Sequence, residues 1–155
     1  MNTLTQKETM LLKDEKAHED LCIKKYARYS NEAEDPELKQ LFSTIGEHEK
    51  QHLNSINSML NGQIPNVNQQ QSQQGQQNIN ANTNNSNIGF IQNDSDLCQD
   101  ALGTEKYVSS TYNSTIFEFK NPSAREVLNH IQKEEQEHGQ QIFDYMYKKG
   151  YYTPQ

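Results

Sequence analysis

The stretches Glu49-Lys50-Gln51-His52 and Glu135-Gln136-Glu137-His138 repeat one Glu-x-x-His pattern at a distance of 86 residues. The same shift brings other residues of like kind into register. The pairs are Glu19 with Glu105, Tyr26 with Tyr112, Pro36 with Pro122, Phe42 with Leu128, Ile45 with Ile131 and Ile56 with Ile142. The sequence therefore predicts two copies of one helical hairpin. Each copy carries a glutamate and, thirty residues later, a Glu-x-x-His motif.

Apolar and aromatic residues recur at three- and four-residue spacing in four stretches, which is typical of amphipathic helices. We expect helices from about Thr5 to Ala33, Pro36 to Asn61, Asp94 to Phe119 and Pro122 to Gly150. Asp35-Pro36 and Asn121-Pro122 each offer a capping side chain and a proline at the first helical position, where no amide hydrogen is needed. Gly62 favours a left-handed cap, and Gly150 ends the last helix. The tail from Tyr151 to Gln155 is expected to be loose.

The low hydrophobic content of 32% has a local cause. Residues 51–93 contain no Asp, Glu, Lys or Arg and are mostly Gln and Asn. Such a composition cannot bury enough apolar surface to order itself. We therefore predict a first hairpin over residues 1–62, a flexible crossover over 63–93 and a second hairpin over 94–150. Together they form one all-α domain, a four-helix bundle with a single long crossover. The crossover is long enough to let two chains exchange hairpins.

The charge of the chain argues against a nucleic-acid partner. Its net charge is −7, and both hairpins contribute to it, because acidic residues outnumber basic ones by eleven to eight in residues 1–50 and by ten to six in residues 94–155. A nucleic-acid-binding protein would instead present a basic face. Residues 1–12 lack an apolar run typical of a signal peptide, and no later segment is expected to span a membrane. Cys22 and Cys98 show no close metal spacing, so we expect them to be reduced thiols in the core.

The three candidate ligands of each hairpin are expected at one level of the bundle. Glu19 precedes Pro36 by 17 residues, whereas Glu49 and His52 follow it by 13 and 16. At about 1.5 Å per residue, they lie roughly 25, 20 and 24 Å from the turn. Glu105, Glu135 and His138 repeat these offsets from Pro122. Because residues i and i+3 share a helix face, each Glu and its His can bind one site.

A metal centre would explain four carboxylates on apolar helix faces. An unpartnered buried ion costs several kcal/mol even after relaxation. Two divalent cations would supply four positive charges, and two neutral imidazoles would complete the ligand set. Oxygen and nitrogen ligands suit iron or manganese, with zinc also possible. The alternatives are hydrogen-bonded core groups, surface residues, or a relic site that holds no metal in the cell. Glu15 or His18 could take the place of Glu19.

The neighbours of these candidates have simpler interpretations. His48, Glu134 and Glu137 flank the motifs but point elsewhere on the helix, so we expect them to be solvated. Tyr26 and Tyr112 lie seven residues past the lone glutamates. They are expected to be core aromatics with satisfied hydroxyls, or to support the ligands by hydrogen bonds.

The ligand pattern and the two-hairpin plan resemble the ferritin-like superfamily, which includes ferritins, rubrerythrins and manganese catalases. The stretches VLNHIQKEEQEHG (residues 127–139) and LGTEKYVSSTYNSTIFEF (residues 102–119) are similar to the Coat F family of bacterial spore coat proteins. The first hairpin, with LLKDEKAHEDLCIKKYARY and EHEKQHLNSINSMLNG, has the same character.

The Coat F resemblance implies a structural coat protein, synthesised in the cytoplasm of the mother cell and deposited on the spore. Its partners would be other coat proteins or a second copy of the chain. The superfamily resemblance implies redox chemistry at the six candidate ligands, and hence a di-iron or di-manganese oxidoreductase acting on peroxide or oxygen. The chain lacks the rubredoxin-type cysteine cluster of rubrerythrins. Whether the protein is an enzyme stays open at this point.

Overall fold

The structure is a computed structural model that describes residues 3–67 and 89–155. It contains the helices α1 (Gln6–Glu32), α2 (Pro36–Leu60), α4 (Gln92–Glu118) and α5 (Pro122–Lys149), and the described residues form no strand. The predicted all-α fold is therefore confirmed. The predicted crossover of residues 63–93 lies largely outside the described residues, because residues 68–88 are not described.

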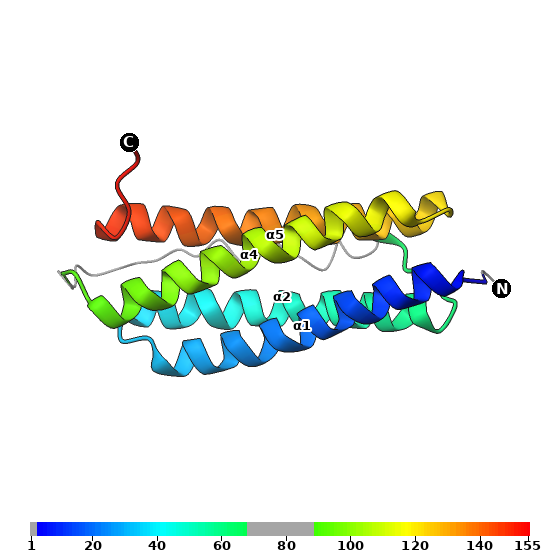
Figure 1. Cartoon of the computed structure of the whole chain (residues 1–155). Coiled ribbons are helices and arrows are strands. Elements are labelled where there is room, and N and C mark those ends of the chain that lie inside the picture. The colour runs from blue at the N-terminus through cyan, green and yellow to red at the C-terminus, as the bar shows by residue number, and fades with distance from the viewer. Residues whose placement is uncertain (1–2, 68–88) are drawn as a thin grey trace.

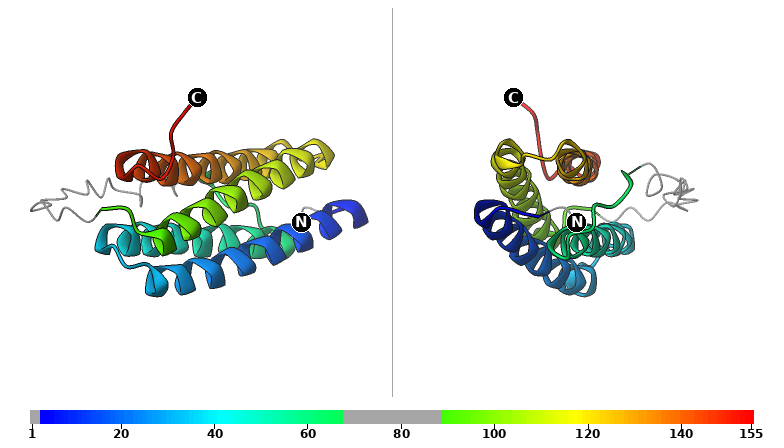
Figure 2. Two further views of the ribbon diagram at one scale, coloured as in Figure 1. Left: turned by 60° about the vertical axis from the view of Figure 1, so that its left-hand side comes forward. Right: turned by 90° about the vertical axis from the view of Figure 1, so that its right-hand side faces the viewer.

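The four helices form a bundle of two antiparallel hairpins, α1–α2 and α4–α5 (Figure 1). Viewed along the bundle, α1 lies beside α4 and α2 lies beside α5 (Figure 2). The end of α2 and the start of α4 lie at opposite ends of the bundle (Figure 1). The segment that joins α2 to α4 must therefore span the length of the bundle.

The helix ends follow the capping residues with one exception, the start of α4. Thr5 and Glu8 form a capping box on α1, while Asp35 and Asn121 cap α2 and α5. Gly62 and Gly150 have φ angles of 79° and 73°, in the left-handed region where glycine is strain-free. Helix α4 starts two residues before the expected Asp94, and its N-cap residue, Ile91, makes no side-chain cap bond.

The expectation of a loose tail is wrong for Tyr151. Its ring is 9% exposed and packs edge-on against Tyr145 and Phe90. Its hydroxyl also accepts a hydrogen bond from the Ile91 amide. An aromatic side chain gains enough from burial to order the backbone next to it.

The bundle interior is apolar at both ends and polar in the middle. Each of the four candidate glutamates lies near the midpoint of its helix. One apolar end includes Leu38, Phe42, Cys98, Ala101 and Met146, and the other includes Leu12, Ile56, Met59, Phe119 and Leu128. Fully burying each large apolar side chain contributes about 1.5 to 3 kcal/mol. Burial of these two apolar ends can therefore offset the free-energy cost of the buried polar layer between them.

Contacts between the hairpins are crossed, so that each hairpin completes the turn of the other. Asp94 of α4 accepts hydrogen bonds from the backbone amides of Glu34 and Asp35, at 2.8 Å each. In the other direction, Glu8 of α1 accepts from the amide of Lys120 at 2.9 Å. Residues 8 and 94, like 34 and 120, are 86 positions apart. The sequence repeat is therefore also a repeat of tertiary contacts, related by an approximate internal two-fold axis.

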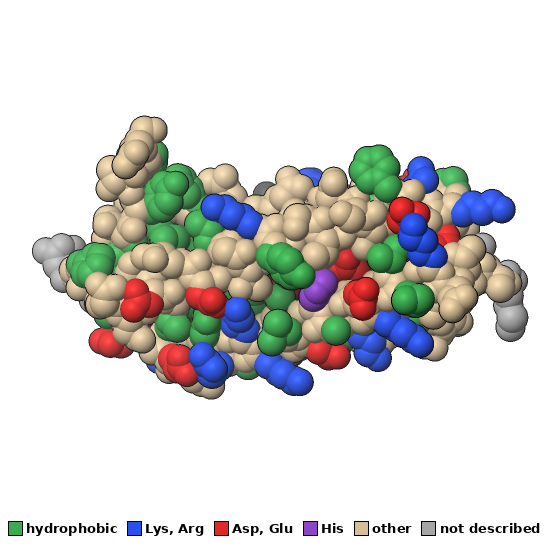
Figure 3. Space-filling view, viewed as in Figure 1, with side chains coloured by type: hydrophobic (Ala, Val, Ile, Leu, Met, Phe, Trp, Pro, Cys, Tyr) green, Lys and Arg blue, Asp and Glu red, His purple; other side chains and the backbone are tan. Residues whose placement is uncertain are grey.

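Acidic and basic side chains are mixed on the face formed largely by α1 and α4, and no broad basic patch occurs on that face (Figure 3). Within the described ranges, no helix combines the length and apolar character needed to cross a membrane.

Candidate metal centre

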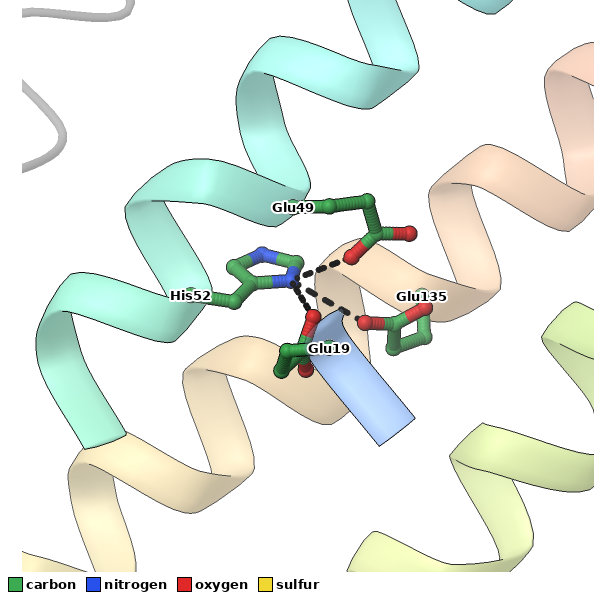
Figure 4. Close-up of side chains that lie close together, drawn as sticks. All are labelled: Glu19, Glu49, His52 and Glu135. Atoms are coloured by element: carbon green, nitrogen blue, oxygen red, sulfur yellow. Dashed lines mark hydrogen bonds and ion pairs between the residues drawn. The ribbon is translucent and has the colours of Figure 1, made fainter. Parts of the chain in front are cut away.

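The six predicted ligands meet in the middle of the bundle, and all of them are buried. One group consists of Glu19, Glu49, His52 and Glu135, whose side chains converge in Figure 4. The other consists of Glu49, Glu105, Glu135 and His138. Each residue offers one ligand atom, and within each group these atoms lie within 4.8 Å of one another. The groups share Glu49 and Glu135, so one glutamate from each hairpin belongs to both.

Both histidines turn Nδ1 toward the carboxylates. The Nδ1 atom of His52 lies 3.0 Å from a carboxylate oxygen of Glu49 and 3.0 Å from one of Glu135. The Nδ1 atom of His138 lies 3.4 Å from Glu49 Oε1 and 3.7 Å from Glu105 Oε2. The i, i+3 spacing therefore places each imidazole beside the shared carboxylates, as the sequence predicts.

The donor atoms of the cluster fit a cation. In the described part of the chain, five buried side-chain atoms have no hydrogen-bond partner, and all five belong to predicted ligands. They are Glu19 Oε2, Glu49 Oε1, Glu105 Oε2, Glu135 Oε2 and His138 Nδ1. Such atoms are rare in folded proteins and call for an explanation such as a bound ion. Oxygen and imidazole donors of this kind suit iron, manganese and zinc. The structure brings the six side chains together, and metal binding itself stays a prediction.

The pKa values of the clustered carboxyl groups show that burying their charges without a cation is energetically unfavourable. Burial raises the pKa of Glu19 to about 8. Burial and the nearby charge of Glu49 raise the pKa of Glu135 well above its usual range. Burial would also raise the pKa of Glu49, but the neighbouring imidazoles of His138 and His52 hold it well below the usual range. Protons must therefore compensate charge that a divalent ion would otherwise neutralise.

The two repeat-related tyrosines support the lone glutamates by hydrogen bonds across the hairpins. Tyr26 of α1 donates its hydroxyl hydrogen to Glu105 of α4, and Tyr112 of α4 donates to Glu19 of α1. Both rings are fully buried. The alternatives for these residues are thus both realised, because each tyrosine is a core aromatic and also holds a candidate ligand.

Two neighbours that were expected to be solvated are instead part of the site. Glu134 is 6% exposed and lies 2.7 Å from His52 Nε2. His48 is half-buried, and its Nδ1 lies 3.1 Å from His138 Nε2. The expectation was wrong because it considered only the face of the helix on which each residue lies. Both side chains contact a histidine of the opposite hairpin. Residues 48 and 134 occupy the same repeat position, and that signal could have revealed them. Glu137 is exposed, as expected.

Glu15 and His18 do not replace Glu19. Glu15 is buried, but it accepts hydrogen bonds from Thr115 at 2.8 Å and Thr111 at 3.0 Å, and His18 Nδ1 lies 3.1 Å from it. These contacts satisfy the Glu15 carboxylate away from the cluster. The two cysteines are free and buried, as expected. Burial, with the surrounding glutamates, raises the pKa of the Cys22 thiol.

The second hairpin matches a known sequence family, and the whole bundle resembles a protein of known structure. Residues 93–155 match the Coat F domain, so the first hairpin lies outside that match. The fold resembles that of a two-domain protein from Anabaena variabilis ATCC 29413 with DJ-1/ThiJ/PfpI-like and ferritin-like domains. The TM-score is 0.71 at 15% identity, with 97% of this chain and 40% of that protein covered. This likeness supports a ferritin-like bundle fold. No curated protein sequence gives a significant match.

Proposed function

We propose that the chain is a structural component of the bacterial spore coat whose bundle holds two divalent metal ions. The coat role is supported by the match of residues 93–155 to the Coat F domain. It implies synthesis in the mother cell, deposition on the spore, and contacts with other coat proteins or a second copy of the chain. The metal centre is supported above all by the five unpartnered ligand atoms inside one buried cluster.

The proposed ions are iron or manganese, with zinc as a further occupant. Glu19 and His52 would bind one ion, Glu105 and His138 the other, and Glu49 and Glu135 would serve both. Bound there, the ions would neutralise the carboxylates and act as Lewis acids or redox centres. The protein's own contribution is to bury these donors and to fix Glu19 and Glu105 through the two tyrosine hydroxyls.

A second candidate function is that of an oxidoreductase acting on peroxide or oxygen. It is favoured by the two ligand groups sharing Glu49 and Glu135, because two redox ions in one compartment can together exchange two electrons with a substrate. This function is compatible with a place in the coat. Its test is whether the loaded protein consumes peroxide and loses that activity together with its metal.

Metal analysis of untagged protein, produced with iron and manganese supplied, tests the metal centre directly. We expect about two ions per chain. Glu135→Ala removes a carboxylate that both groups share, so it should lose most of the metal. Glu137→Ala lies two positions away on an exposed face and should keep both ions. Full metal content in Glu135→Ala, or none in the unaltered protein, would reject the proposed centre.

The coat role needs a separate test, since a metal centre alone says nothing about location. A fluorescent fusion of the chain, produced during sporulation of a spore-forming bacterium, is expected to gather around the spore. A fusion that stays spread through the mother cell would contradict the coat role.

A further inference from the structure

We propose that the two metal positions are unequal, and that the position containing His52 binds a divalent cation more tightly than the one containing His138. The difference comes from the two side chains behind the histidines. Glu134, a carboxylate, braces His52, whereas His48, an imidazole, braces His138. This inference rests on the proposed metal centre and assigns a positioning role to two residues outside the ligand set.

The geometry of the two braces follows the internal repeat. Glu134 of α5 reaches α2, where one of its oxygens lies 2.7 Å from His52 Nε2. His48 of α2 reaches α5, where its Nδ1 lies 3.1 Å from His138 Nε2. The rings of His48 and His138 also stack, with centroids 5.3 Å apart. One position of the repeat thus performs the same task twice, with a different chemical group in each hairpin.

Coordination determines the direction of these hydrogen bonds. A histidine that binds a cation through Nδ1 carries its remaining ring hydrogen on Nε2, so Nε2 must donate. His52 would then donate to a carboxylate oxygen, and His138 to an imidazole nitrogen. That nitrogen can accept only if it carries no hydrogen, so His48 is neutral in this contact.

A charged acceptor makes the stronger brace. Hydrogen bonds to an ionised acceptor are roughly twice as strong as those between neutral groups. A carboxylate behind a metal-binding histidine also increases the basicity of the ring, and removing such partners typically lowers metal affinity about 10- to 100-fold. Glu134 has a further contact, because His130 Nε2 lies 3.4 Å from its other oxygen. The first cation should therefore enter beside His52, and the second must share Glu49 and Glu135 with it.

Titration of the metal-free full-length protein with Co²⁺, followed by its visible absorption, tests the inference. Two binding steps are expected, the first of them tighter. Glu134→Gln keeps the size and an acceptor oxygen but removes the charge, so it should weaken the tight step by about 10- to 100-fold. His48→Glu gives both histidines a carboxylate. It should strengthen the weak step and bring the two steps together.

The controls separate positioning from folding. Glu137→Gln removes a charge from an exposed position of α5 and should leave both steps unchanged. Urea unfolding of each variant shows whether it is folded. The ring N–H proton of His52, shifted by bound Co²⁺ in NMR spectra, should move in Glu134→Gln but not in the control. Equal steps in the unaltered protein, or equal weakening of both by Glu134→Gln, would overturn the inference. Failure to bind any Co²⁺ would instead reject the metal centre.

Discussion

Glu19 and Glu105 each accept a hydrogen bond from a tyrosine of the other hairpin. No additional residue is needed for this support. A buried carboxylate without hydrogen bonds is among the most expensive groups a core can contain. Tyrosine supplies a donor and a large apolar ring together. The same residue thus fills the core and satisfies the site.

Replacing Tyr112 by Phe should destabilise the metal-free protein. The change keeps the ring but removes the hydroxyl that donates to Glu19. We expect a loss of about 1 to 3 kcal/mol in the free energy of unfolding, measured by urea denaturation in the presence of a chelator. Tyr107→Phe is the matched control on α4, because that side chain is 60% exposed. Equal stabilities of the two variants would show that the hydroxyl contributes nothing.

The sequence was sufficient to predict which six side chains meet, but not what lies behind them. The six candidate ligands are marked by residue type, spacing and level, all of which can be read from the sequence. Glu134 and His48 act across the interface between α2 and α5, and their neighbours in sequence do not reveal this. The sequence repeat pairs residue 48 with residue 134, and the contacts across the hairpins then place Glu134 behind His52 and His48 behind His138.

At the scale of the elements, the start of α2 is tied to the end of α5. Asp35 caps α2 through the Glu37 amide, and it also accepts hydrogen bonds from Tyr145 at 2.8 Å and Lys149 at 2.9 Å. Burial by itself would raise the pKa of Asp35, but these three partners together lower it below its ordinary value. The cap is thus also a tertiary contact between the two hairpins.

Acid should weaken this contact. Because the pKa of Asp35 is lower in the folded than in the unfolded chain, its contribution is present above the unfolded pKa of about 4 and is lost as pH falls through the folded value. Asp35→Asn keeps a good cap but cannot carry the charge. We expect this variant to melt below the unaltered protein at pH 6, and the gap in Tm to close as pH falls below about 4.

Asp96→Asn serves as the control for this pH dependence, because Asp96 is exposed on α4. It should show little difference in Tm from the unaltered protein throughout that range. A gap for Asp35→Asn that stayed constant with pH would mean that the Asp35 charge does not contribute.

Helix limits were predictable where a capping residue marks them. Asp35-Pro36, Asn121-Pro122 and Gly150 gave the bounds of α2 and α5 closely. Helix α4 begins at Gln92 without a side-chain cap, so nothing local marks its first turn. The sequence predicts a helix start at Asp94, whereas the Asp94 carboxylate accepts hydrogen bonds from the amides of the α1–α2 turn. That role depends on the other hairpin.

At the scale of the whole molecule, the distance that the crossover must span sets its minimum length. Helix α2 has 25 residues and is about 37 Å long, which requires at least about 11 or 12 extended residues. The chain from the end of α2 to the start of α4 comprises residues 61–91, well above this minimum.

Shortening the crossover should therefore have two distinct outcomes. Deleting residues 70–79 leaves enough chain, and stability should change by only a few tenths of a kcal/mol. Deleting residues 68–88 leaves residues 61–67 and 89–91, which reach at most about 35 Å. Two such chains are expected to exchange hairpins and form a dimer. Light scattering after size-exclusion chromatography distinguishes a monomer from a dimer. A monomer of the 68–88 deletion variant would contradict the expected minimum length of the crossover.

The contacts between the two hairpins also determine when, during synthesis, the candidate metal site can be assembled. The ribosome completes the first hairpin while the second is still untranslated. At that moment Glu19, Glu49 and His52 are present, but the tyrosine for Glu19, the brace for His52 and the acceptor for the α1–α2 turn are all encoded downstream. The nascent chain therefore carries three of the six candidate ligands but none of the second-hairpin side chains that contact them. Loading of the proposed metal centre would then be a post-translational event, delayed by translation itself until both hairpins can close around the ions.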